Sequence, residues 1–114
     1  MLTIDTLRAY GANVEEGLTR CMGMEGFYLG LVGKIRNDNH VRRLEESVRA
    51  GDLDSAFEAA HALKGVLANL ALTPALNPVS EITEALRARR EMDYEPLLLK
   101  VRTEWDRLTA LLDA

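Results

Sequence analysis

Cysteine and positive charge are both scarce in this chain. Cys21 is the only cysteine, so an internal disulfide and a thiolate-rich zinc site are excluded, and nothing requires an oxidising compartment. The formal net charge is -4, with 14 Lys and Arg against 18 Asp and Glu. Proteins that bind nucleic acid neutralise its phosphates with clustered Lys and Arg. The composition therefore argues against a nucleic-acid partner.

Long apolar runs are missing as well. A membrane-spanning helix needs roughly 20 apolar residues in succession, and no stretch of the sequence approaches that length. The first residues, Met1 to Thr6, have neither the basic leader nor the apolar run of a signal peptide. Glycine-rich phosphate loops and the Walker and protein-kinase signatures are also absent. We therefore expect a soluble, cytoplasmic chain without membrane contact and without ATP-dependent kinase activity of its own.

The dominant pattern in the sequence is a helical period. Apolar residues recur at the 3.6-residue spacing of an α-helix, and alternating strand patterns are absent. A chain of 114 residues with 47% hydrophobic residues is large enough for a single domain over residues 1–114 with its own core. We predict an all-α fold, an antiparallel four-helix bundle in up-down-up-down order with two short N-terminal helices.

Caps, glycines and prolines set the expected limits of the helices. The predicted helices run from Asp5 to Ala9, Asn13 to Gly23, Glu25 to about Arg36, Asp38 or Asn39 to Gly51, Asp52 to about Leu72, Thr73 to about Arg90, and Asp93 to Leu112. The helix that starts at Glu25 is predicted to be the first long helix of the bundle. Its expected buried face consists of Phe27, Tyr28, Leu31, Val32 and Ile35.

The helix from Asp52 to about Leu72 carries the residues with chemical potential. Its apolar stripe consists of Leu53, Ala56, Phe57, Ala60, Leu63, Leu67 and Leu70. With roughly 100° per residue in an α-helix, His61 lies on the flank of this stripe, beside Lys64 and Gly65. We therefore predict that His61 is exposed. Glycine inside a helix costs about 1 kcal/mol relative to alanine, and close approach of a second protein to the imidazole is a sufficient reason for Gly65.

The residue types at this site suit phosphoryl transfer. Imidazole has an unperturbed pKa near 6.5, so much of it is a neutral nucleophile at neutral pH and needs no base to attack a phosphoryl group. The phosphorylated ring would carry close to two negative charges, which Lys64, one turn along the helix, could offset. The sequence therefore predicts a chain that receives and gives a phosphoryl group without generating one from ATP.

The segment from Ala60 to Leu72, AHALKGVLANLAL, resembles the A-H-x-L-K-G-x-x-x-N-[LI]-G-[LA] helix of the histidine-containing phosphotransfer (HPt) family of two-component phosphorelays. The resemblance extends over nearly the whole chain in helix order. It implies that His61 is the phosphoryl acceptor, Lys64 its charge partner, and Gly65 the gap that admits the partner's active site. The chain departs from the family at Ala71, where glycine is usual.

The resemblance also implies the partners. His61 would take a phosphoryl group from a receiver-domain aspartate of a response regulator, or from a hybrid sensor histidine kinase, and pass it to another receiver-domain aspartate. The Mg²⁺ that assists transfer would belong to the receiver domain, so we expect neither a cofactor nor a metal in this chain. We expect a monomer, because an exposed transfer site on a bundle needs no second copy.

A second interpretation stays open from the residues alone. The chain could be a non-catalytic helical-bundle interaction module that regulates a signalling partner by docking alone, with His61 a passive surface residue. His40 is expected to be a first-turn surface residue and Cys21 a small packing residue. A metal site would need His40, His61 and Cys21 to converge from three remote segments, so the sequence argues against metal binding. Trp105 is expected in the core, and Arg87, Arg89 and Arg90 are expected to favour the end of a helix.

Overall fold

The computed structural model describes residues 2–113, and over these residues it is all-helical. The elements are α1 (Ile4–Tyr10), α2 (Val14–Arg20), α3 (Glu25–Gly33), the 3₁₀ helix η1 (Lys34–Asn37), α4 (His40–Arg49), α5 (Leu53–Asn69), α6 (Thr73–Arg87) and α7 (Glu95–Asp113). The predicted all-α class is confirmed. None of these helices is long and apolar enough to cross a membrane.

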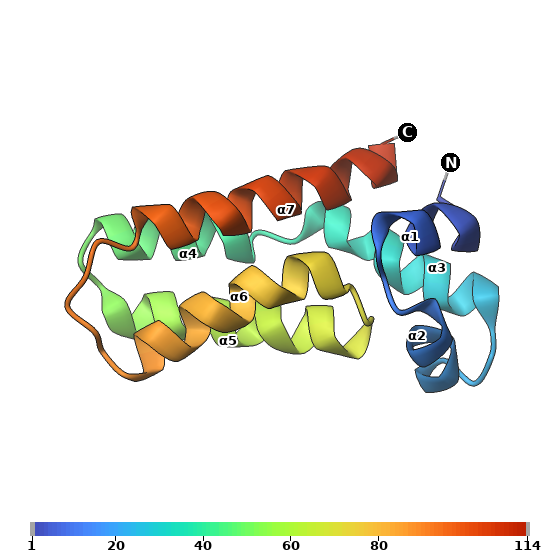
Figure 1. The fold of residues 1–114 in the computed structure, drawn as a ribbon, viewed down its shortest axis with the longest axis horizontal. Helices are drawn as coiled ribbons and strands as arrows, with labels where there is room; N and C mark the ends of the chain where they lie inside the picture. Colours follow the sequence, from blue (N-terminus) through green and yellow to red (C-terminus); the bar gives the residue numbers. More distant parts are fainter. Residues whose placement is uncertain (1, 114) are drawn as a thin grey trace.

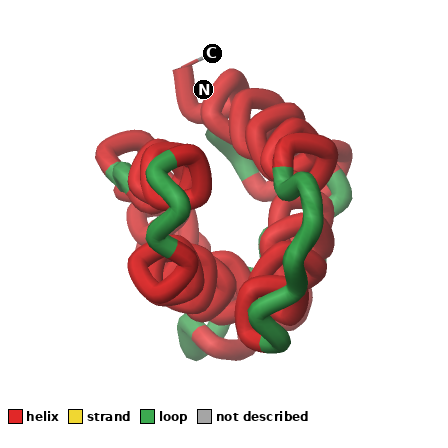
Figure 2. The backbone as a smooth tube through the Cα atoms, turned by 90° about the vertical axis from the view of Figure 1, so that its left-hand side faces the viewer, coloured by secondary structure: helices red, strands yellow, loops and turns green. Residues whose placement is uncertain are grey.

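The helices α4, α5, α6 and α7 form an elongated body (Figure 1). Together with the N-terminal helices, the molecule measures 42 × 25 × 20 Å. Within this body, α5, α6 and α7 each run in the direction opposite to the helix before, as the colours of Figure 1 show. Seen along the long axis, the helices surround a central space (Figure 2), and their buried apolar side chains fill it. Trp105 on α7 is only 6% exposed, so the prediction that it is a core residue is confirmed.

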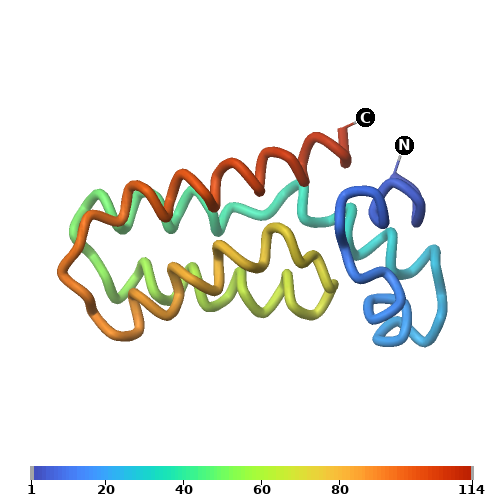
Figure 3. The backbone as a smooth tube through the Cα atoms, viewed as in Figure 1, coloured from blue at the N-terminus to red at the C-terminus, as the bar shows by residue number. Residues whose placement is uncertain are grey.

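The N-terminal helices lie together at one end of this body (Figure 3). The predicted place of the helix that starts at Glu25 was wrong, because α3 ends at Gly33 and lies beside α2 instead of opening the bundle. Three glycines, Gly26, Gly30 and Gly33, lower its helix propensity, which favours a short helix. Its predicted buried face is correct for Tyr28, Val32 and Ile35, whereas Phe27 is 53% exposed.

Tyr28 anchors the N-terminal helices to the end of α5. The side chain is fully buried, and its hydroxyl donates a hydrogen bond to the Leu70 carbonyl at 2.7 Å. The ring lies so close to α2 that a Cβ atom at Gly17 would be 2.5 Å from it. Burial raises the pKa of Tyr28 to about 12. Glycine at position 17 therefore allows α3 to approach α2 and α5 together.

The ends of α5 are defined by its flanking residues. The Asp52 carboxylate accepts a hydrogen bond from the Ser55 backbone N–H at 3.0 Å, which caps the first turn as predicted and lowers the Asp52 pKa. The helix ends at Asn69, earlier than the predicted Leu72, because the chain reverses at Ala71 with φ of 56°. Glycine adopts this left-handed conformation without strain, which gives a physical reason for the glycine that the resemblance implies at this position.

Candidate functional site

His61 lies near the middle of α5, and its side chain is exposed. The stripe residues on either side of it, Ala60 and Leu63, are fully buried, so the predicted separation between core and flank is correct. The imidazole stacks on the ring of Phe57, one turn earlier, with centroids 5.5 Å apart and an angle of 16° between the planes. The ring is therefore open to solvent but supported on one side by its own helix.

Lys64 follows one turn after His61 and is half-buried at 35% exposure. Its Nζ atom lies 3.5 Å from Oε2 of Glu84 on α6. The structure thus gives the predicted charge partner of His61 an acidic partner of its own, which the sequence pattern did not show.

Gly65 is exposed, and a Cβ atom added there would meet no atom within 4 Å outside its own helix. The next turn of the same surface carries the exposed Asn69 and the partly buried Ala68, whose carbonyl accepts a hydrogen bond from the Arg20 guanidinium of α2. The helix surface at Gly65 is therefore uncovered by any side chain. A second molecule could reach His61 across this position.

Three neighbours of the site were not identified from the sequence. Phe57 was assigned to the core stripe, but it is only half-buried and contacts His61. The guanidinium carbon of Arg87 lies 5.1 Å from the centroid of the Phe57 ring, and Arg87 Nε lies 3.4 Å from Glu84 Oε1. The i, i+4 spacing of Phe57 and His61 is the one signal in the sequence that indicates such a contact. Glu84 and Arg87 reach the site only through the packing of α6 on α5.

The other histidine and the cysteine lie apart from this site. His40 is half-buried at the start of α4, where Nδ1 of its ring lies 2.8 Å from the Asp38 carboxylate. Cys21 is buried after α2. Within residues 2–113, no group of three His, Cys, Asp or Glu side chains is arranged to hold a metal ion.

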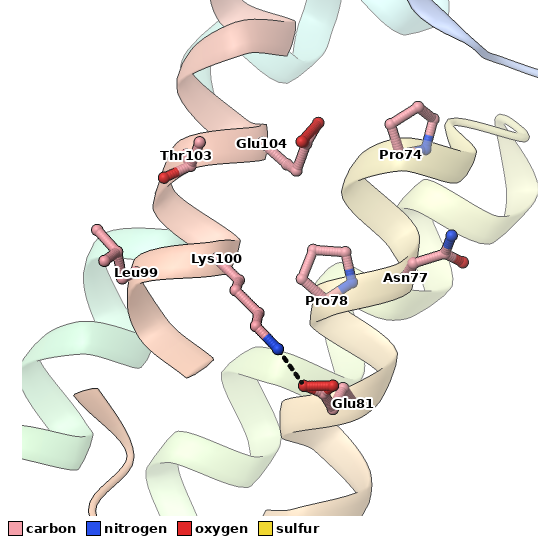
Figure 4. Close-up of a pocket in the computed structure, with 8 residues that line it drawn as sticks. All are labelled: Pro74, Asn77, Pro78, Glu81, Leu99, Lys100, Thr103 and Glu104. Atoms are coloured by element: carbon pink, nitrogen blue, oxygen red, sulfur yellow. Dashed lines mark hydrogen bonds and ion pairs between the residues drawn. The ribbon is translucent and has the colours of Figure 1, made fainter. Parts of the chain in front are cut away.

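A surface groove of about 520 Å³ lies between α6 and α7 (Figure 4). It is lined by Pro74, Asn77, Pro78, Glu81, Leu99, Lys100, Thr103 and Glu104. Lys100 Nζ and Glu81 Oε1 form an ion pair of 3.2 Å at this groove. Neither His61 nor Lys64 lines it, so the groove and the candidate site are separate features of the molecule.

A protein-family model described as "Hpt domain" matches residues 35–113, which is more than half of the chain. The matched part begins within η1 and includes α4 to α7, together with His61, Lys64 and Gly65. No curated protein and no solved structure is significantly similar to the chain.

Proposed function

The chain belongs to the Hpt domain family, whose members take part in histidine phosphotransfer in phosphorelays, and from this premise we propose that it is a phosphorelay carrier with His61 as the phosphoryl acceptor. His61 receives the phosphoryl group from a receiver-domain aspartate, or from a sensor kinase, and passes it to another receiver-domain aspartate. The observation that carries this proposal is the exposed imidazole of His61 next to the open surface at Gly65.

The chemistry at His61 needs one ring nitrogen as nucleophile. The lone pair of the neutral imidazole attacks phosphorus, a nitrogen–phosphorus bond forms, and the phosphorus–oxygen bond to the aspartate breaks. The aspartate leaves as a carboxylate with the electron pair of that bond. The proton on the other ring nitrogen stays there or passes to water. The same steps in reverse deliver the phosphoryl group to the next aspartate.

Lys64 and Gly65 have supporting roles in this proposal. The phosphoryl group on His61 carries nearly two negative charges, and the Lys64 ammonium, one turn away, compensates part of that charge. Gly65 leaves the approach to the imidazole free, because a transfer between two proteins requires the aspartate to come within bonding distance of the ring nitrogen.

The partners follow from the same proposal. They are a response-regulator receiver domain and a hybrid sensor histidine kinase, without nucleic acid or membrane. The chain holds no cofactor, and the Mg²⁺ that assists transfer is bound by the receiver domain. We further propose that residues 1–114 act as one up-down-up-down four-helix-bundle domain and work as a cytoplasmic monomer.

Transfer from phosphorylated receiver domains tests the function. Receiver domains labelled with radioactive phosphate on aspartate are incubated with the wild-type chain and with His61→Gln. We expect an acid-labile, alkali-stable label on the wild-type chain and none on the variant. If the chain acts by docking alone, the receiver domain binds both proteins and neither acquires label. An equal label on His61→Gln would also contradict the proposal.

A further inference from the structure

Glu84 on α6 forms salt bridges with two basic side chains beside the candidate site. One carboxylate oxygen, Oε2, lies 3.5 Å from Lys64 Nζ, and the other, Oε1, lies 3.4 Å from Arg87 Nε. The Glu84 side chain is 57% exposed, so it is accessible at the surface where α5 meets α6. A single acidic residue, Glu84, is thus paired with both Lys64 and Arg87.

Lys64 and Arg87 both lie near His61, the first along α5 and the second through the ring of Phe57. Lys64 follows His61 by one helical turn. Arg87 lies over the ring of Phe57, and that ring stacks on the imidazole. A phosphoryl group on His61 therefore forms within one turn of a lysine that is already paired with a carboxylate.

We propose that Glu84 is a positioning residue that holds Lys64 as its resting counter-ion and thereby makes phosphohistidine at position 61 less stable. This inference rests on the proposed function. The phosphoryl group and Glu84 compete for the same ammonium group, and the two anions repel each other. An exposed ion pair is weak, so the phosphoryl group displaces Glu84 when it forms but gains less than it would from a free lysine. The remaining instability favours transfer onward to an aspartate.

The chain contains a matched pair for comparison. Glu81 lies three residues before Glu84 on the same helix and pairs with Lys100 on α7 at 3.2 Å (Figure 4). Both glutamates are exposed, and each links α6 to a lysine of a neighbouring helix. Only the lysine bound by Glu84 is close in sequence to His61 on α5. Neutralising Glu81 therefore removes the same charge from the same helix without freeing Lys64.

Phosphoryl exchange with a small molecule measures this effect without a partner protein. Monophosphoimidazole transfers its phosphoryl group to His61 and leaves as imidazole; one nitrogen–phosphorus bond breaks and one forms. The ratio of the forward and reverse rate constants, followed by ³¹P NMR, gives the equilibrium constant of the exchange. We expect Glu84→Gln to raise this constant roughly 1.4- to five-fold, the range of an exposed ion pair, and Glu81→Gln to leave it unchanged.

Two further conditions separate electrostatics from structure. In 1 M NaCl, where the Debye length is about 3 Å, the difference between wild type and Glu84→Gln should largely disappear. In a Lys64→Met background, the effect of Glu84→Gln should be smaller, because the counter-ion is gone. An undiminished difference in high salt or in the Lys64→Met background would overturn the inference.

The outcomes distinguish this inference from the proposed function. Equal exchange constants for wild type and Glu84→Gln, or an equal increase in Glu81→Gln, overturn the role of Glu84 and leave phosphorylation of His61 intact. If the wild-type chain forms no phosphohistidine, the proposed function fails and the inference fails with it.

Discussion

The imidazole of His61 stacks on the phenyl ring of Phe57, with centroids 5.5 Å apart and planes inclined by 16°. An exposed side chain on a helix normally samples several rotamers, and this contact favours the one in which the rings are parallel. Aromatic pairs contribute about 0.5–1.5 kcal/mol beyond their buried area, which is enough to bias the orientation of the ring. The proposed nucleophile is therefore exposed, and its ring is biased towards one orientation.

Removing the Phe57 ring should disturb His61 more than it disturbs the fold. We expect Phe57→Leu to reduce the rate of transfer from a labelled receiver domain, and to lower the free energy of unfolding by only about 1 kcal/mol, since the size of the side chain is nearly kept. Phe57→Tyr keeps the ring and should transfer at the wild-type rate. The His61 ring protons should lose a ring-current shift in the NMR spectrum of Phe57→Leu. Wild-type transfer by Phe57→Leu would contradict a positioning role.

A side chain at position 65 should stabilise the protein and impair transfer. Because a Cβ atom at Gly65 meets no neighbour, Gly65→Ala should raise the free energy of unfolding by about 0.5–1 kcal/mol, the difference in helix propensity. Urea unfolding measures this gain. The added methyl group stands on the proposed approach to His61, so the rate of transfer should fall, and Gly65→Arg should abolish it.

Gly30 provides the control for this test. It lies within α3, and a Cβ atom there also meets no atom within 4 Å. Gly30→Ala should give a similar gain in stability with no change in transfer. If Gly65→Ala and Gly65→Arg both transfer normally, partner access at Gly65 is not required.

Loss of the Lys64 ammonium should affect phosphoryl transfer with little effect on stability. The pair that it forms with Glu84 lies at the surface, with Lys64 half-buried and Glu84 exposed, and surface pairs contribute about 0.2–1 kcal/mol. Lys64→Ala should therefore unfold close to the wild-type denaturant concentration but accumulate less phosphohistidine. Lys100→Ala breaks the comparable pair with Glu81 and should leave phosphorylation unchanged. Equal phosphohistidine levels in Lys64→Ala and wild type would remove Lys64 from the mechanism.

Alkaline pH should weaken the attachment of the N-terminal helices. The pKa of Tyr28 is raised by burial to about 12 in the folded protein, whereas a free tyrosine has a pKa of about 10. The phenol therefore ionises first in the unfolded chain. Its contribution to stability is complete below pH 10 and is lost as the pH rises towards 12. Tyr10, whose pKa is raised to about 12 chiefly by burial, acts in the same direction.

Denaturant unfolding at pH 9 to 12 measures this dependence. The free energy of unfolding should fall over that interval, and Tyr28→Phe, which cannot ionise, should show a shallower decline. A variant with the same slope as the wild-type protein would show that the buried hydroxyl of Tyr28 does not cause the effect.

Much of the helical structure was predictable because its signals are local. The burial of Ala56, Ala60, Leu63 and Leu67 on α5, the Asp52 cap and the flank position of His61 all depend on residues within or next to one helix, and the structure has them as predicted. The end of α5 was less predictable. Ala71 takes a left-handed conformation that alanine rarely adopts, so the residue type gave no sign of the turn.

The rest of the site depends on neighbours that a single helix does not contain. Glu84 lies twenty residues after Lys64 along the chain, and only the pairing of α5 with α6 brings the two together. Phe57 was misassigned because an apolar residue at the edge of a stripe fits equally well in the core or at a surface contact. The place of α3 beside α2 likewise depends on how Tyr28 fits against Gly17.

Locating the phosphoryl group within the chain tests the central claim most directly. The sequence has two histidines, and His40 is an internal control because its ring is held by Asp38 at the start of α4. After incubation with a phosphorylated receiver domain, mass spectrometry under alkaline conditions should find phosphate on the peptide that contains His61. Wild type and His40→Gln should carry it equally, and His61→Gln should carry none. Phosphate on His40, or its persistence in His61→Gln, would contradict the account.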